Sequence, residues 1–135
     1  MQIEANGIRM EYEIGGPEGA PTVMLSHSLG SSGVMWDNEF AALAQHFRVI
    51  RYDTRGHGGS HRTQGAYSLD LLGDDAMALM DALGLGPVHW VGLSMGGMIS
   101  LNLALRAPQR LRSLSLCDTT SQVPAEAKAV WDDRI

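Results

Sequence analysis

The stretch "HWVGLSMGGM" at residues 89–98 constrains the fold more than any other part of the chain. An apolar run leads into a Gly-x-Ser-x-Gly centre, and a second apolar run follows it. This order predicts a strand that turns sharply into a helix at Ser94, because glycines at the flanking positions keep such a tight turn free of collisions. The alternative interpretation is a glycine-rich strand-to-helix turn that holds a serine by chance.

A serine in this turn has a chemical use. Its hydroxyl is a weak nucleophile at neutral pH, but the N–H groups at a helix N-terminus favour the negative charge that develops during attack on a carbonyl. The backbone N–H of Met95 is then a candidate oxyanion donor. The glycine-rich segment "SHSLGSSGVMW" (residues 26–36) follows another predicted strand and offers the N–H of Leu29 as a second donor. Its alternative interpretation is a flexible loop in which His27 is a hydrogen-bonded structural residue.

Hydrophobic patterning predicts the strands. Residues 3–6 and 8–14, separated by Asn6-Gly7, are typical of a hairpin, because Asn-Gly readily adopts the positive φ angles of a two-residue turn. Four short apolar runs suit strands with both faces buried, as in parallel sheets. These runs are residues 22–28, 47–53, 87–94 and 111–118.

Helical spacing of apolar residues separates these runs. A helix capped by Asp37 is expected first, then one that begins after Ser68 and ends near Gly84, then one from Met95 to about Arg106. Strands that alternate with helices predict an α/β fold with a doubly wound, mostly parallel sheet, preceded by the N-terminal β-hairpin.

Composition excludes several classes of function. Of the 135 residues 44% are hydrophobic and 19% charged, which suits one folded domain with a core and not a disordered tail. The net charge of -5 and the scattered basic residues give no surface for nucleic acid. No apolar run reaches the roughly 20 residues that span a bilayer, and the N-terminus lacks a signal-peptide pattern, so we expect a soluble, cytoplasmic protein without membrane contact.

The segment "YDTRGHGGS" (residues 52–60) is typical of a turn whose Asp53, Arg55 and His57 hold loops together through hydrogen bonds. Phosphate binding is a weaker interpretation, because the chain has neither a Gly-x-Gly-x-x-Gly nor a P-loop pattern. His57 and His61 alone are too few for a metal site, and no cofactor is expected.

Three segments together resemble the α/β-hydrolase family: "LSHSLGSS" and "RYDTRGHGGS" after successive strands, and "VGLSMGG" at the turn. The resemblance covers nearly the whole chain. "HSLGSS", "DTRGHGGS" and the tail "LCDTT…AVWDDRI" are most similar to the 3-oxoadipate enol-lactonase branch. The resemblance implies a cofactor-free serine hydrolase of aromatic degradation that cleaves an ester or lactone through an acyl-enzyme. Ser94 would be the nucleophile, with Leu29 and Met95 as oxyanion donors.

The resemblance also implies a catalytic histidine after the nucleophile, and this chain has none there. The family order is nucleophile, acid, histidine, yet all five histidines here precede Ser94. Asp118 lies where some members carry the acid, although a polar turn residue is the first interpretation. Trp131 and Arg134 are candidates for substrate binding, with packing and a solvated helix position as their alternatives.

We therefore expect residues 1–122 to be the N-terminal part of a hydrolase core and residues 123–135 the start of a helical cap, so that the sheet is incomplete at the C-terminus. The strand at residues 111–118 would then be a sheet edge. On this hypothesis the chain alone is inactive, and it is poorly soluble or depends on a partner: its C-terminal part as a second chain, or an oligomer. A natural truncation is the alternative.

Two alternative functions stay open. An esterase or cofactor-free perhydrolase of the same fold would use the same serine and oxyanion donors. A non-catalytic member of the fold would bind a small ligand without hydrolysing it.

Overall fold

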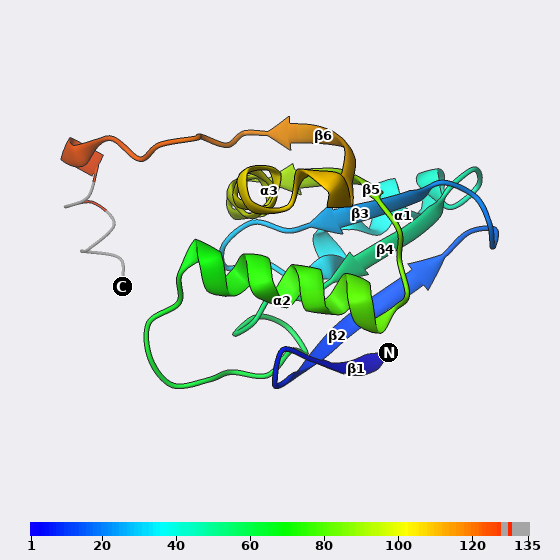
Figure 1. Ribbon diagram of the computed structural model, residues 1–135, viewed down its shortest axis with the longest axis horizontal. Coiled ribbons are helices and arrows are strands. Elements are labelled where there is room, and N and C mark those ends of the chain that lie inside the picture. Colours follow the sequence, from blue (N-terminus) through cyan, green and yellow to red (C-terminus); the bar gives the residue numbers. More distant parts are fainter. Residues whose placement is uncertain (128–129, 131–135) are drawn as a thin grey trace.

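The computed structural model describes residues 1–127 and 130, which form a mixed six-stranded sheet with helices on both faces (Figure 1). The strands are β1 (Gln2–Ala5), β2 (Ile8–Gly15), β3 (Thr22–Ser26), β4 (Arg48–Tyr52), β5 (Val88–Leu93) and β6 (Leu111–Cys117). The α-helices are α1 (Asp37–Leu43), α2 (Leu69–Ala82) and α3 (Met95–Arg106), and the 3-10 helices are η1 (Gly33–Trp36), η2 (Pro108–Arg110) and η3 (Ala125–Ala127).

The sheet has the order β1-β2-β4-β3-β5-β6. The first two strands form the predicted hairpin, with φ of 48° at Asn6 and 73° at Gly7 in the turn. β2 pairs antiparallel with β4, whereas β4, β3, β5 and β6 are parallel. The expected α/β class, hairpin and mostly parallel sheet are thus confirmed.

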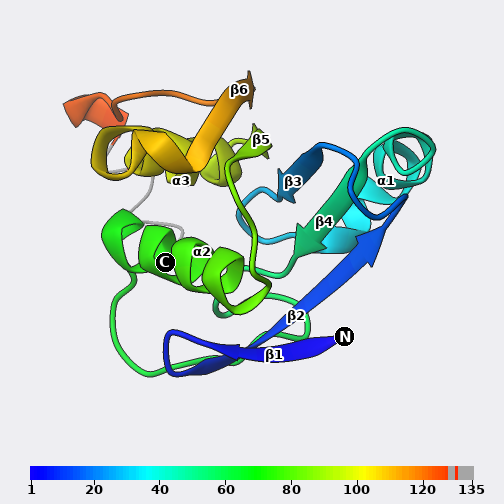
Figure 2. The same cartoon turned by 45° about the vertical axis from the view of Figure 1, so that its right-hand side comes forward.

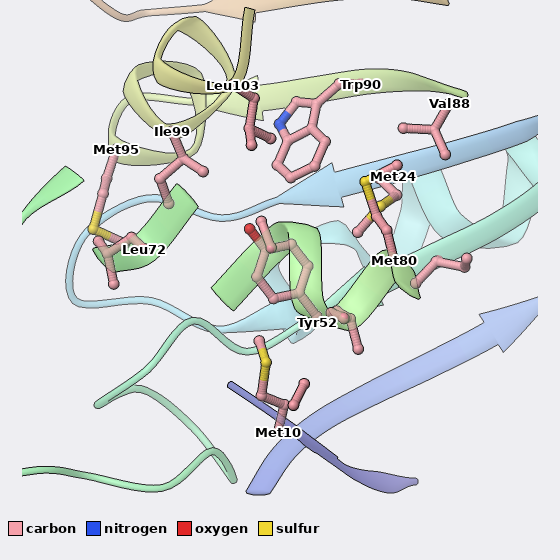
Figure 3. Packing of buried hydrophobic residues seen from close by; sticks show 14 of the residues in the cluster. Met10, Met24, Tyr52, Leu72, Met80, Val88, Trp90, Met95, Ile99 and Leu103 are labelled. Atoms are coloured by element: carbon pink, nitrogen blue, oxygen red, sulfur yellow. The ribbon is translucent and has the colours of Figure 1, made fainter. Parts of the chain in front are cut away.

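Two hydrophobic clusters lie on opposite faces of the sheet. Figure 2 shows the helices that cover these faces, α2 and α3 on one and α1 on the other. The larger cluster packs α2 and α3 against one face, with Trp90 and Tyr52 at its centre and their rings in an edge-to-face contact (Figure 3). The smaller packs α1 and η1 against the other face, where Trp36 is 6% exposed. Trp36 is therefore a core residue.

The parallel strands all end at one edge of the sheet (Figure 1). The loops that follow β3, β4 and β6 meet there, beside the turn between β5 and α3. In doubly wound sheets this edge is where ligands bind. The topology therefore gathers the chemically interesting segments of the sequence in one place.

The helices agree with their sequence signals, with one exception. The Ser68 hydroxyl caps α2 by accepting a hydrogen bond from the N–H of Leu71, at 3.1 Å, and Gly84 has a φ of 65° just beyond the helix. The prediction that Asp37 caps α1 is wrong. η1 runs directly into α1, so Asp37 is already helical, and its carboxylate binds Arg51 instead of a backbone N–H.

In the part of the chain that the structure describes, β6 is an edge strand, and Leu116 on it is 44% exposed. This agrees with the expected sheet edge, whereas poor solubility stays a prediction. No helix among the described residues has the length and apolar character to cross a membrane.

Candidate active site

Ser94 is the single residue between β5 and α3, and its backbone is in a conformation that L-amino acids rarely adopt. Its φ is 52° and its ψ is -111°. Two hydrogen bonds hold this turn, one to the last residue of β6 and one to the segment after it. The N–H of Ser94 donates to the carbonyl of Cys117 at 2.9 Å, and the hydroxyl of Thr119 donates to the carbonyl of Ser94 at 2.7 Å. Strain of this kind persists only where the surroundings fix it, and it is concentrated at functional sites.

The two glycines of the motif are required by close backbone approach. A Cβ on Gly92 would lie 2.4 Å from the carbonyl carbon of Gly96, inside the turn itself. A Cβ on Gly96 would lie 2.1 Å from the carbonyl oxygen of Ser26, at the end of β3. The glycine spacing thus lets α3 start directly against the sheet, which leaves Ser94 projecting at the sheet's carboxyl edge.

Ser94 lines a pocket of about 190 Å³ together with Leu29, Met95, Met98 and Val123. The structure therefore brings the candidate nucleophile and both candidate oxyanion residues to one place. Among the hydrogen bonds of residues 1–127, neither the N–H of Leu29 nor that of Met95 donates to a protein acceptor. Both N–H groups remain available to a bound oxygen atom.

Two histidines tie the loop that carries Leu29 to the loop after β4. Nε2 of His57 accepts from the N–H of Gly30 at 3.1 Å, and its Nδ1 donates to the carbonyl of Arg55. Nε2 of His27 accepts from the N–H of Thr54 at 2.9 Å, and its Nδ1 donates to the carbonyl of Ser28. Burial lowers the pKa of His27, which favours the neutral ring that these bonds require.

The segment at residues 52–60 holds loops together, as its sequence predicted. Asp53 accepts from the N–H of Gly33 at 2.7 Å and from the N–H of Gly59 at 2.8 Å. Arg55 forms a buried, two-pronged ion pair with Asp75 of α2. Asp53 and Arg55 therefore fix the loops of this segment, and the Arg55 guanidinium is not free to bind a phosphate group.

Other residues singled out in the sequence do not join the pocket. Asp118 is exposed after β6, with a φ of 42°. No hydrogen bond links the Ser94 hydroxyl to a general base among the side chains that the structure describes. Trp131 and Arg134 lie outside the described residues, so their predicted substrate contacts stay predictions.

Three neighbours of Ser94 were not predicted from the sequence. Met98 lies one helical turn after Ser94, so helical periodicity alone was a usable signal for it. Thr119 and Val123 reach the site from the segment after β6, and no sequence pattern indicates this contact. In residues 1–127 no group of three His, Cys, Asp or Glu side chains is placed to hold a metal ion.

A family model described as "alpha/beta hydrolase fold" matches residues 21–134 of the chain. "3-oxoadipate enol-lactonase 1" of Acinetobacter baylyi is 37% identical over 93% of this chain and 47% of its own length. A Caulobacter protein named "Putative carbamate hydrolase RutD" is 40% identical over 96% of this chain and 49% of its own length.

Solved structures agree with these relatives. The crystal structure of the enol-lactonase from Burkholderia xenovorans LB400 superposes with a TM-score of 0.94 at 40% identity, covering 99% of this chain and 52% of that one. The chain therefore spans about half the length of the relatives that it matches.

Proposed function

Because the chain belongs to the alpha/beta hydrolase fold family, we propose that it carries the nucleophile and the oxyanion hole of a serine hydrolase that cleaves a carboxylic ester or lactone. The pocket that unites Ser94 with the free N–H groups of Leu29 and Met95 is the observation that carries this proposal. It contains the two features that acyl transfer requires, a hydroxyl that opens into the pocket and N–H donors for a developing oxyanion.

The reaction follows from this geometry in two halves. The Ser94 oxygen adds to the substrate carbonyl carbon while its proton passes to a general base. The carbonyl oxygen becomes an oxyanion beside the N–H groups of Leu29 and Met95. Collapse of this intermediate breaks the bond to the leaving oxygen, which takes up the proton. Water then adds to the acyl-enzyme in the same way and releases the acid and Ser94.

In an enol-lactone the leaving oxygen stays attached to the acyl chain as an enol. The enol becomes a ketone when its O–H proton is lost and a proton is added to carbon. The enol-lactonase relatives support this substrate class for the complete protein. The relatives named as carbamate hydrolases favour a second candidate, cleavage of a carbamate carbonyl by the same serine and the same donors.

In this proposal the general base that takes the Ser94 proton is neither His57 nor His27. His57 and His27 each use Nε2 as the acceptor for a loop N–H, so neither ring is free to take the Ser94 proton. Asp118 stays a candidate for the acid, because it follows β6 at the correct edge of the sheet. Residues 123–135 begin the helical cap in this scheme, and Trp131 and Arg134 stay the candidates for substrate binding.

A fluorophosphonate probe tests the proposal, applied to the 135-residue chain and to the protein of the complete gene. Covalent labelling of Ser94 in the complete protein, abolished by Ser94→Ala and kept in a control variant of the exposed Ser121, is the expected result. The complete protein should also hydrolyse enol-lactones or aryl esters. Binding of such compounds without labelling and without turnover would instead indicate a non-catalytic ligand-binding protein.

A further inference from the structure

A second and larger cavity adjoins the Ser94 pocket. It measures about 560 Å³ and lies between Leu29 and Met95 on one side and the segment 63–69 with Leu72 on the other. Leu29 and Met95 line both cavities, so a group bound at Ser94 extends directly into the larger one. The Met95 side chain points toward Leu72 of α2, which gives this cavity an apolar floor (Figure 3).

No charged side chain lines this cavity among the residues that the structure describes. Its polar side chains are already paired with protein groups. The Tyr67 hydroxyl accepts from the N–H of Thr63 and donates to the Thr63 carbonyl, while the Thr63 hydroxyl accepts from Arg55. The Ser68 hydroxyl caps α2, and both ring nitrogens of His57 hold loop backbone.

The lining decides what the cavity can bind. Most of the described lining residues are apolar and none is charged, so a carboxylate that entered the cavity would give up hydration without gaining a cation, which is costly. A methylene group that entered it would lose only contact with water, and this is favourable. A volume of this size is in the range of sites that enclose most of a small organic ligand.

We propose that this cavity is an acyl subsite for an uncharged, apolar group attached to the carbonyl that Ser94 attacks. The inference rests on the proposed function, and it narrows the substrate class to esters and lactones that are apolar on this side of the carbonyl. The carboxylate of a 3-oxoadipate enol-lactone would then lie outside this cavity, on the other side of Ser94.

Hydrolysis of p-nitrophenyl esters by the complete protein tests the subsite. Neutral acyl chains from acetate to octanoate are compared with chains of matched length that end in a carboxylate. We expect kcat/KM to rise with each added methylene by up to about fourfold until the cavity is filled. The esters that end in a carboxylate should show no such rise and fall at least about tenfold below their neutral counterparts.

Ala66 offers a way to fill the subsite, because it lines the cavity and is exposed. Ala66→Phe should lower the ratio of octanoate to acetate kcat/KM about tenfold or more. Ala41→Phe, at an exposed position of α1 on the other face of the sheet, is the matched control and should keep the ratio of the unmodified protein. A ratio that is equal in the two variants would overturn the proposal.

Two more results separate this proposal from the function on which it rests. Turnover of acetate without a rise along the neutral series, or with a preference for the acidic series, overturns the subsite and leaves the serine hydrolase intact. Absence of both turnover and labelling rejects the hydrolase. Calorimetric titration of the Ser94→Ala variant with octanoate and with octanedioate needs no turnover, because the two ligands differ only in a carboxylate at the far end of the chain: tighter binding of octanoate supports the subsite, and binding of neither, or tighter binding of octanedioate, contradicts it.

Discussion

Nε2 of His57 accepts a hydrogen bond from the backbone N–H of Gly30, one residue beyond the candidate oxyanion donor Leu29, at 3.1 Å. Gly30 has a φ of 73°, so the loop changes direction at the point where the histidine holds it. Nothing in residues 1–127 bonds the N–H of Leu29 itself, and its orientation therefore depends on this neighbouring contact. If Leu29 supplies an oxyanion donor as proposed, His57 is its positioning residue.

Replacing His57 separates positioning from folding. His57→Leu removes the acceptor for Gly30 and should lower kcat for ester hydrolysis by the complete protein about tenfold, with KM nearly unchanged, because a displaced donor stabilises the transition state less. His57→Gln restores an acceptor oxygen and should recover most of the rate. His61→Leu, at an exposed position of the same loop, is the control and should behave as the unmodified protein. Equal loss in the Leu and Gln variants, or a rise in KM alone, would argue against this role.

The backbone at Ser94 predicts that replacing this candidate nucleophile by glycine raises the stability of the fold. A φ of 52° and a ψ of -111° are costly for any residue with a Cβ, by about 1–3 kcal/mol. Ser94→Gly removes this strain and should raise the free energy of unfolding by about 1 kcal/mol, after its own entropic cost of about 0.5–1 kcal/mol. Ser94→Ala keeps the Cβ and should show no gain. Urea denaturation of the two variants provides the comparison, and a Gly variant no more stable than the Ala variant would refute the strain.

The contact of α3 with β3 predicts a large effect of one methyl group. Gly96→Ala would place a Cβ 2.1 Å from the carbonyl oxygen of Ser26, a backbone atom that cannot move without shifting the strand. We expect a loss of at least about 1–3 kcal/mol of unfolding free energy. Gly86→Ala is the matched control, because no atom lies within 4 Å of the Cβ it introduces. Thermal unfolding should show a lower midpoint for the first variant alone, and equal midpoints would show that the close approach is not rigid.

Local signals in the sequence were sufficient for most of the fold. Asn6-Gly7 indicated the hairpin, Ser68 indicated the start of α2, and the glycine spacing around Ser94 indicated the turn from β5 into α3, because each signal acts through its immediate neighbours. The start of α1 was misplaced at Asp37. A 3-10 turn leads into that helix, and the aspartate is drawn to Arg51 on β4, which is a tertiary contact.

The hydrogen bonds between the loops of the site could not be predicted from the sequence either, because they are also tertiary contacts. That His57 binds Gly30, and that Thr119 binds the carbonyl of Ser94, depends on how loops from separate strands meet at the sheet edge. Residue types and spacing identified three of the residues that line the pocket, Leu29, Ser94 and Met95. They gave no information on the larger apolar cavity beside it, which α2 and the segment 63–69 form together.

The buried ring of His27 predicts a loss of stability in weak acid. Burial lowers its pKa in the folded chain below the ordinary value of 6.5, so the unfolded chain binds the proton more strongly. The contribution of the neutral ring to stability is complete above about pH 6.5 and decreases as the pH falls below 6.5 toward the lowered pKa, by at most about 1.4 kcal/mol for each pH unit. Urea denaturation at pH 7.5, 6.5 and 5.5 measures this decrease.

A matched pair of variants assigns the pH effect to this residue. His27→Gln cannot titrate, so its deficit relative to the unmodified protein should shrink between pH 7.5 and 5.5. His46→Gln, at an exposed position, should leave the pH dependence unchanged. A deficit of His27→Gln that stays constant over this range would show that the ring is not held neutral.

Adjacent aspartates on α2 predict opposite outcomes of the same substitution. The Asp75 side chain is 1% exposed and binds two nitrogens of Arg55, which is 7% exposed, so Asp75→Ala leaves a buried guanidinium without its partner. We expect a loss of about 3–5 kcal/mol of unfolding free energy, enough to unfold much of a marginally stable chain. Asp74→Ala breaks an ion pair with Arg106 in which both side chains are more than a third exposed, and it should cost about 0–1 kcal/mol. Circular dichroism through a urea titration distinguishes the two, and similar midpoints would mean that water replaces the lost carboxylate at Arg55.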